Sequence, residues 1–230
     1  MKTRQILLAS AAVAGLSLVN AAAASANQWY VSVAGGANWL GDDSFSLATS
    51  GPTNTFNFFN DPSTGFVFTG AVGMGLGQYM NGLRGEVELG YRENNVRGTW
   101  FSTSTNGSGS GALDYQHSTF SVMANVWYDF QVAGLSPYIG GGIGWANAEA
   151  DGTFSSTGSL PLDGSESGFA WQLGAGLSLD IQPGLKADLG YRYFQGPDVS
   201  IPGPYFPTNP IVGEVNEENH SVTVGLRVEM

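Results

Sequence analysis

The feature that most constrains this chain is an alternation of apolar and polar residues that recurs in segments of strand length. The gaps between consecutive segments are short and long in turn. Successive side chains of a strand point to opposite faces, so each segment presents one apolar and one polar face. Tight turns that alternate with long polar loops are typical of transmembrane β-barrels. The pattern predicts an all-β fold, an eight-stranded antiparallel up-and-down transmembrane β-barrel with short periplasmic turns and four long extracellular loops.

The first predicted strand shows the pattern most clearly. Trp29, Val31, Val33 and Trp39 share one of its faces. About ten residues tilted by roughly 40° rise ~25 Å, which matches the apolar band of outer-membrane barrels between its two aromatic girdles. The eight predicted strands are residues 28–40, 65–77, 83–92, 115–130, 137–148, 167–181, 185–195 and 220–230.

The N-terminal residues have the composition of a secretory signal peptide. Lys2 and Arg4 precede an apolar run over residues 6–19, and Ala24-Ser25-Ala26 forms a small-residue cleavage site. The run is shorter than the roughly 20 residues that a helical membrane span needs. We therefore expect a cleaved signal peptide at residues 1–26 and a barrel domain at residues 27–230, located in the outer membrane.

A secreted soluble barrel of the lipocalin kind is the main structural alternative, because periodicity does not tell which face points outward. Composition decides between the two. Only 12% of the residues are charged, whereas a soluble domain carries about a quarter. The polar faces contain mainly Gly, Ala and Ser, which suit the crowded interior of a small barrel. Composition therefore favours the membrane barrel.

The charged residues on the polar faces are nearly balanced in sign. Buried charges need partners, so we expect a network of salt bridges and hydrogen bonds that occludes the lumen. A hydrated lumen with solvated charges, which would let small solutes pass, stays open as an alternative. The predicted lumenal charge network contains Arg84, Glu86, Glu88, Arg92, Asp129, Asp180, Lys186, Asp188, Arg192, Arg227 and Glu229.

Aromatic residues near the strand ends are expected to form the interfacial girdle. The remaining acidic residues fall in the long gaps, where we interpret them as a solvated acidic crown, since no spaced oxygen-ligand motif for a cation is present. The girdle residues are Trp29, Trp39, Tyr91, Trp145, Trp171 and Tyr193. The loop acids are Asp42, Asp43, Asp61, Glu93, Asp114, Glu149, Asp151, Asp163, Glu166, Asp198, Glu214, Glu217 and Glu218.

Few residues offer catalytic chemistry. The chain has no cysteine and two histidines, His117 and His220. The adjacent Ser118 and Ser221 point to the face opposite each histidine, which argues against a histidine-serine pair. We therefore expect no enzyme activity, no cofactor and no metal site. The place of His220 on an apolar face leaves a lipid A-modifying enzyme as a distant alternative.

Three segments resemble the OmpA-like outer-membrane β-barrel family, which includes opacity-type surface antigens and small porin-like proteins of Gram-negative bacteria. They are residues 137–144 (PYIGGGIG), 187–193 (ADLGYRY) and 220–227 (HSVTVGLR). The resemblance implies a fold and an outer-membrane location rather than a reaction. The last strand also resembles the signal that the barrel-assembly machinery reads, although it ends in Met instead of an aromatic residue. The signal residues are Val224, Leu226, Val228 and Met230.

These observations lead us to expect a non-enzymatic structural barrel with a surface-antigen role. Its expected partners are outer-membrane lipid, lipopolysaccharide, the assembly machinery and, through the loops, host or phage. We expect no nucleic-acid partner because the net charge is −11. A small passive porin-like channel for ions or small solutes is the alternative function, and the glycines of the polar faces favour it.

Overall fold

The computed structural model describes residues 29–41, 46–48, 55–77, 79–104, 107–130, 132, 134–155, 159–202 and 212–230. The predicted signal peptide lies outside these residues and stays a prediction. Within them there is no helix with the length and apolar character of a membrane span. The strands are β1 (Trp29–Leu40), β2 (Ser46–Ala48), β3 (Thr55–Pro62), β4 (Gly65–Gly75), β5 (Leu83–Ser104), β6 (Gly107–Asp129), β7 (Ser136–Ser155), β8 (Ser159–Gln182), β9 (Leu185–Gln195), β10 (Val199–Pro202), β11 (Val212–Val215) and β12 (Glu218–Glu229).

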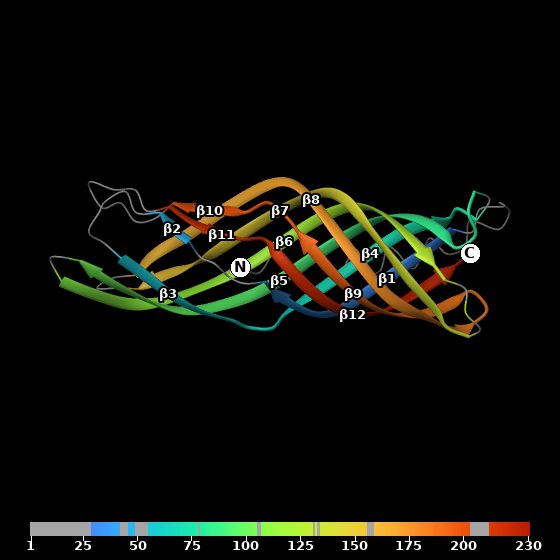
Figure 1. Ribbon diagram of the computed structural model, residues 1–230, viewed down its shortest axis with the longest axis horizontal. Helices are drawn as coiled ribbons and strands as arrows, with labels where there is room; N and C mark the ends of the chain where they lie inside the picture. Colours follow the sequence, from blue (N-terminus) through green and yellow to red (C-terminus); the bar gives the residue numbers. More distant parts are fainter. Residues whose placement is uncertain are drawn as a thin grey trace, which may run out of the picture.

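Eight of these strands close into an antiparallel barrel (Figure 1). The hydrogen-bonded order is β5-β4-β1-β12-β9-β8-β7-β6, and β6 pairs back onto β5. The closure joins the two ends of the described chain, because β1 pairs with β12 from Tyr30–Glu229 to Leu40–Asn219. The predicted eight-stranded up-and-down barrel is confirmed.

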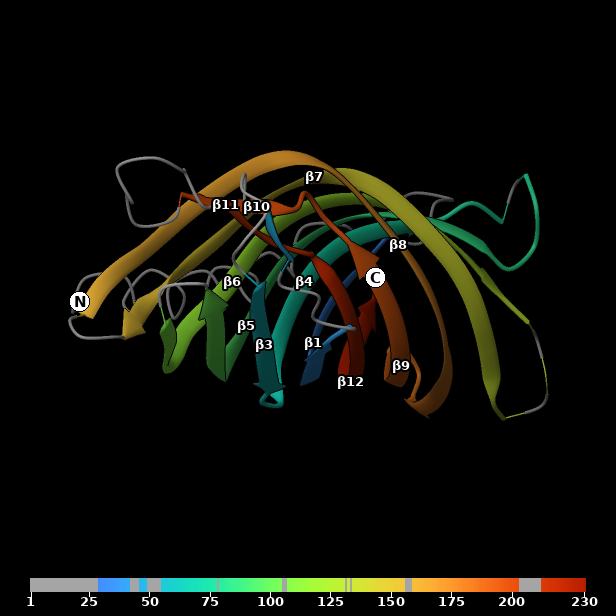
Figure 2. The same ribbon diagram turned by 60° about the vertical axis from the view of Figure 1, so that its left-hand side comes forward.

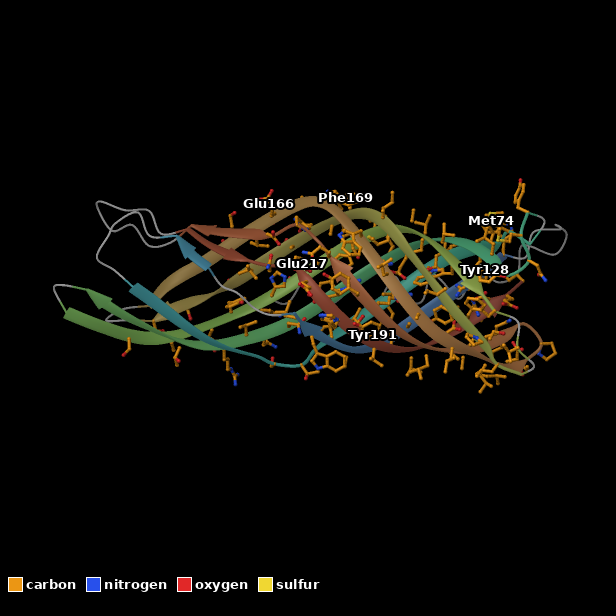
Figure 3. The ribbon with its side chains drawn as sticks, viewed as in Figure 1. Met74, Tyr128, Glu166, Phe169, Tyr191 and Glu217 are labelled. Atoms are coloured by element: carbon orange, nitrogen blue, oxygen red, sulfur yellow. The ribbon has the colours of Figure 1, made fainter. Side chains whose placement is uncertain are left out.

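The outer wall of the barrel is apolar and its interior is polar. Val87 is 57% exposed, Ile143 60% and Val224 66%, whereas the neighbouring Glu86 and Glu88 are buried. Figure 3 shows Phe169 projecting from the outer side of β8. An exposed face so rich in large apolar side chains suits lipid rather than water.

Three tight turns lie at one end of the barrel, which we name the turn end. Each contains a glycine with positive φ: Gly82 at 86°, Gly134 at 79° and Gly184 at 79°. Glycine adopts this conformation without the steric penalty of a Cβ. The amide of Met230 donates to the carbonyl of Trp29 at 2.8 Å, so both ends of the described chain lie here. The opposite end, from which the long connections leave, is the loop end.

Four strands are longer than the sequence predicts. Residues 93–114 and 149–166 were expected to be loops, yet β5 to β8 continue through much of them as two paired hairpins. Figures 1 and 2 show these ribbons running far beyond the other barrel strands. Apolar alternation reports only the segment that one face buries in lipid. Beyond that segment the ladder continues through backbone hydrogen bonds between polar residues, which leave no such pattern.

The first and fourth long connections also contain strands, where the sequence predicts loops. β3 pairs with the extended part of β5, and β10, β11 and β2 form a separate three-stranded sheet. This small sheet packs on the inner side of the extended strands through an apolar cluster. The cluster consists of Leu40, Val96, Tyr115, Ala148, Ala150, Val199 and Val215.

Gly73 makes room for the ring of Tyr30 inside the barrel. A Cβ at Gly73 would lie 2.3 Å from Cζ of Tyr30, and the Tyr30 hydroxyl donates to Glu86 Oε2 at 2.7 Å, which holds the ring in place. We expect Gly73→Ala to lower the free energy of unfolding by about 1–3 kcal/mol. Urea unfolding in lipid vesicles measures this change.

Gly70→Ala, on the outer face of the same strand, is the matched control. The nearest atom to its added Cβ is 4.0 Å away, so this variant should be as stable as the wild type. Equal stability of the two variants would contradict the tight fit of Tyr30.

Candidate functional site

The polar interior of the barrel is the candidate functional site. Near the turn end, Arg84 Nε lies 2.8 Å from Asp129 Oδ2, and Arg84 Nη1 donates to the hydroxyl of Tyr30 at 3.2 Å. The Arg84 guanidinium also lies over the rings of Trp127 and Tyr138, at 5.8 and 5.2 Å from their centroids. Arg84 is therefore held by a carboxylate, a hydroxyl and aromatic faces together.

Arg227 of β12 is the second cation of this region. Its Nη2 donates to Ser178 Oγ at 2.8 Å and lies 3.4 Å from Asp188 Oδ1. Its Nη1 is 3.8 Å from Asp129 Oδ2, and its Nε is 3.9 Å from Glu229 Oε1. One buried guanidinium thus faces three carboxylates from three strands.

The predicted residues Asp180, Lys186 and Glu229 lie at the rim of the turn end. Lys186 Nζ is 3.3 Å from Asp180 Oδ1 and 3.4 Å from Glu229 Oε1. The Asp180 side chain is 61% exposed. Screening by water weakens such pairs, so they contribute less than the buried ones.

Two glutamates occupy the middle of the lumen. Glu86 Oε1 accepts hydrogen bonds from Asn125 at 3.0 Å and from the Trp127 indole at 2.8 Å. Glu88 pairs with Arg192 and accepts from Gln172 Nε2 at 3.1 Å. The two carboxylates belong to one strand, but their partners come from β6, β8 and β9, so the network ties strands across the barrel.

Arg92 lies further toward the loop end and is fully enclosed. Its guanidinium stacks on Phe194, 3.7 Å from the ring centroid, and its Nη1 donates to Ser121 Oγ at 3.1 Å. Its Nε and Nη2 have no hydrogen-bond partner among the described residues. Met123, Ala146 and Phe194 belong to the apolar cluster at this level. Arg92 is thus the least compensated charge of the predicted network.

Glu217 forms a buried cluster at the loop end, and this corrects the sequence-based expectation of a solvated loop acid. It is 0% exposed and contacts His117. Thr119 Oγ1 and Asn219 Nδ2 donate to Glu217 Oε1 at 2.6 and 2.8 Å. Figure 3 shows Glu217 between the strands. The signal that finds it is the alternation Val215, Glu217, Asn219, which continues the inner face of β12 upstream.

The electrostatics of Glu217 follow from these contacts. Burial by itself raises the pKa of the carboxyl, but the adjacent His117 imidazole and the Thr119 hydroxyl outweigh burial and hold the pKa below its ordinary value. The carboxylate is therefore the stable form of Glu217 in the folded protein.

The described part of the lumen contains a small cavity between these layers. A cavity of about 30 Å³ is lined by Arg84, Glu86, Trp127, Tyr138 and Arg192 among others. This volume holds a couple of water molecules. No group of three or more His, Asp or Glu side chains within the described residues is placed to hold a metal ion.

His220 lies on the outer wall beside aromatic rings. Its Nδ1 is 2.7 Å from the Tyr191 hydroxyl, and its Nε2 is 3.5 Å from Glu218 Oε1. Ser221 is buried on the opposite, inner face. The structure thus places Tyr191 beside His220, while the adjacent Ser221 faces the lumen. His117, the other histidine, faces the lumen.

The predicted girdle residues lie on the outer wall. Trp29 at the turn end and Trp39 at the loop end are each 39% exposed, and Trp145 is 46% exposed. Trp171 and Tyr193 contact each other with ring centroids 5.2 Å apart, and Tyr91 is half-buried. The predicted assembly-signal residues Val224 and Leu226 also point outward, while Val228 and Met230 are half-buried; their recognition stays a prediction.

The comparison that decides the family covers nearly the whole chain. Residues 8–227 match the family described as outer membrane protein beta-barrel domain. The chain belongs to this family. Membership places the barrel in the outer membrane of Gram-negative bacteria and confirms the suspected resemblance, whereas cleavage of the signal peptide is untested.

Known relatives of this outer-membrane barrel give little about its activity. A protein of Brucella suis biovar 1 (strain 1330), described only as uncharacterized, is 31% identical over a 182-residue alignment that covers 66% of this chain and 64% of that protein. One of Brucella abortus (strain 2308) is 32% identical over the same shares. The barrel chain therefore spans less than two thirds of the length of these relatives.

Among solved structures, neisserial surface protein A has a TM-score of 0.51 and 18% identity, over 90% of this chain and 100% of that chain. The outer membrane protease OmpT from Escherichia coli has a TM-score of 0.48 and 9% identity, over 92% and 99%. At such identities the likeness to neisserial surface protein A shows the fold alone.

Arg227→Ala tests the network of this barrel. We expect the variant to lower the free energy of unfolding by about 3 kcal/mol, the low end for a broken buried pair, because three partly buried carboxylates lose their cation. Arg97→Ala is the matched control, since the Arg97 side chain is 83% exposed and lies 3.8 Å from Asp114. It should leave unfolding in urea unchanged. A loss as small for Arg227→Ala as for Arg97→Ala would refute the stabilising role of the network.

Proposed function

We propose that this protein is a non-enzymatic structural barrel of the outer membrane with an occluded lumen. The packed lumen keeps the barrel rigid, and its exposed loop end contacts lipopolysaccharide, host or phage. The observation that carries the proposal is the paired charge network of the lumen. Arg84, Glu86, Glu88 and Arg227 are each at most 8% exposed, and their partners come from strands all around the barrel. A network that connects strands across the lumen supports a structural role better than a passive channel.

The lumenal glycines also support a scaffold, although in the sequence they favour a channel. A Cβ at Gly140 would lie 2.6 Å from Trp127 Cε3, and a Cβ at Gly176 would lie 2.4 Å from Tyr138 Cζ. Together with Gly73 beside Tyr30, these glycines accommodate large rings. The space that they leave is occupied by aromatic side chains.

The outer wall supports contact with lipid. Its apolar band lies between aromatic residues at both ends, which is the arrangement that anchors barrels at the two membrane interfaces. The extended hairpins of β5 to β8 carry the acidic residues Asp114, Asp151 and Asp163 beyond this band. These hairpins form the surface that is most accessible to lipopolysaccharide or to an external partner.

Conductance discriminates the scaffold from the passive channel. We expect the mature protein, residues 27–230 by our prediction, to give no single-channel current in a planar bilayer, because paired charges and aromatic rings project into the lumen from strands on several sides. A heat-dependent gel shift confirms that folded barrel is present. Steady conductance steps from the folded protein would support the passive porin-like channel and reject the occluded scaffold.

The lipid A-modifying alternative rests on His220 and its neighbour Tyr191. We expect the lipid A mass spectrum of the host to be the same with the wild type, with His220→Ala and with no copy of the protein, because the adjacent Ser221 is buried on the inner face, away from His220. A mass change that requires the wild-type protein and disappears in His220→Ala would overturn the non-enzymatic assignment.

A further inference from the structure

The outer face of the extended strands β5 to β8 carries rows of polar side chains just beyond the lipid band, which we name the polar face. Strand pairing places one residue of each strand directly opposite its neighbours, so each row runs across all four strands. Adjacent strands lie about 4.8 Å apart and alternate residues about 6.7 Å apart, so the face measures roughly 14 by 13 Å. From the loop end toward the membrane, its rows are Asn95, Gln116, Asp151 and Asp163; Glu93, Ser118, Glu149 and Ser165; and Tyr91, Phe120, Asn147 and Ser167.

Aromatic rings border the polar face on its membrane side. Trp145 and Phe169 belong to the next row toward the membrane and are 46% and 65% exposed, and Phe120 beside them is 43% exposed. These rings present apolar surface directly next to hydrogen-bonding groups. A sugar ring has the same two components, because its C–H faces are apolar and its edges carry hydroxyls.

The polar face offers hydrogen-bond donors and acceptors together. All four residues of its first row are exposed, and they combine the amides of Asn95 and Gln116 with two carboxylates. An amide both donates and accepts, and a carboxylate accepts. The amide of Asn147 already donates to two hydroxyls of this face, Ser165 Oγ at 3.2 Å and Ser167 Oγ at 2.8 Å. The groups present therefore suit a ligand rich in hydroxyls.

The charge of the polar face does not suit phosphate. The sequence has no Lys or Arg between Arg97 and Lys186, so β6, β7 and β8 carry neither residue. Arg97 lies at the β5 margin, 3.8 Å from Asp114. Asp151 and Asp163 are directly opposite each other, an arrangement of like charges that destabilises a sheet. Because phosphate groups in proteins are held mainly by cationic side chains, this face favours an uncharged ligand.

We propose, building on the lipopolysaccharide contact of the proposed function, that the polar face binds the uncharged sugars of lipopolysaccharide rather than its phosphates. The amides and carboxylates of the first row bind sugar hydroxyls, and Phe120 and Trp145 contact the apolar face of the sugar nearest the membrane. Hydroxyls that donate to a carboxylate form charge-assisted bonds, which are about twice as strong as neutral ones. The height of the face fits this ligand, since the sugars of lipopolysaccharide begin where the lipid band ends.

The core oligosaccharide of the host's own lipopolysaccharide, released from lipid A and dephosphorylated, is the probe. We expect saturation-transfer NMR to detect its binding to the folded barrel in deuterated detergent. Gln116→Ala combined with Asp151→Ala should weaken binding by about tenfold or more, because the hydrogen bonds of two facing side chains are lost. The dependence of the transfer on sugar concentration measures this change.

Gln195→Ala combined with Glu218→Ala is the matched control. This pair also sets an amide directly opposite a carboxylate, but it lies on β9 and β12, away from the extended strands. It should leave the affinity for the oligosaccharide unchanged. No transfer to the wild type, or equal weakening by the two double variants when both show the gel shift of a folded barrel, would overturn sugar recognition.

The phosphorylated form of the same oligosaccharide separates sugars from phosphates. We expect it to bind no more tightly than the dephosphorylated form, and tighter binding would reject the assignment to uncharged sugars. Vesicles of intact lipopolysaccharide separate this failure from that of the proposed function. A barrel that binds the vesicles but not the oligosaccharide would refute sugar recognition alone, whereas a barrel that binds neither would also refute the lipopolysaccharide contact.

Discussion

The constraint on which this structure depends is that a strand in lipid must find hydrogen-bond partners for its backbone within the protein. The pairing of β1 with β12 meets this requirement, because it joins the two edges that an open sheet would leave bare. Closure by eight strands then sets a narrow interior, just wide enough for side chains to fill. The inward side chains cannot reach bulk solvent, so their charges have to be compensated by other residues of the lumen.

That balance explains why the lumen combines charges with aromatic rings. Arg84 pairs with Asp129 and also lies over Trp127 and Tyr138, and Arg92 stacks on Phe194. Rings fill volume and stabilise guanidinium groups through cation–π attraction, while carboxylates neutralise them. Glycines opposite the rings supply the room. The interior thereby behaves as a packed core made of polar and aromatic residues in place of aliphatic ones.

The loop end follows a different rule, because water is available beyond the membrane. There β5 to β8 continue as two hairpins, and a second, apolar cluster forms between them and the small sheet of β2, β10 and β11. Within the membrane the barrel is therefore polar inside and apolar outside. Beyond the membrane its interior is apolar, as in a soluble protein. Glu217 lies where the two meet, which is why its carboxylate is both buried and fully hydrogen-bonded.

The eight barrel strands, their inward and outward faces and the membrane environment can be predicted from the amino-acid sequence, since burial of one face in lipid leaves a strict alternation. The sequence also predicted Arg84, Glu86, Glu88 and Arg227 as inward residues, because parity along a strand places each of them. The residues that these side chains contact could not be predicted from the sequence. The hydrogen bonds of Glu86 with Asn125 and Trp127 depend on the register of the strands.

The arrangement of the chain beyond the lipid could not be predicted in this way. The continuation of β5 to β8 through residues 93–114 and 149–166 rests on backbone pairing that polar sequences do not reveal. The burial of Glu217 depends on barrel closure, which brings it against His117 of β6, a hundred positions away in the chain. Local alternation predicts which face of a strand a side chain lies on, whereas contacts between distant parts of the chain determine which residues it packs against.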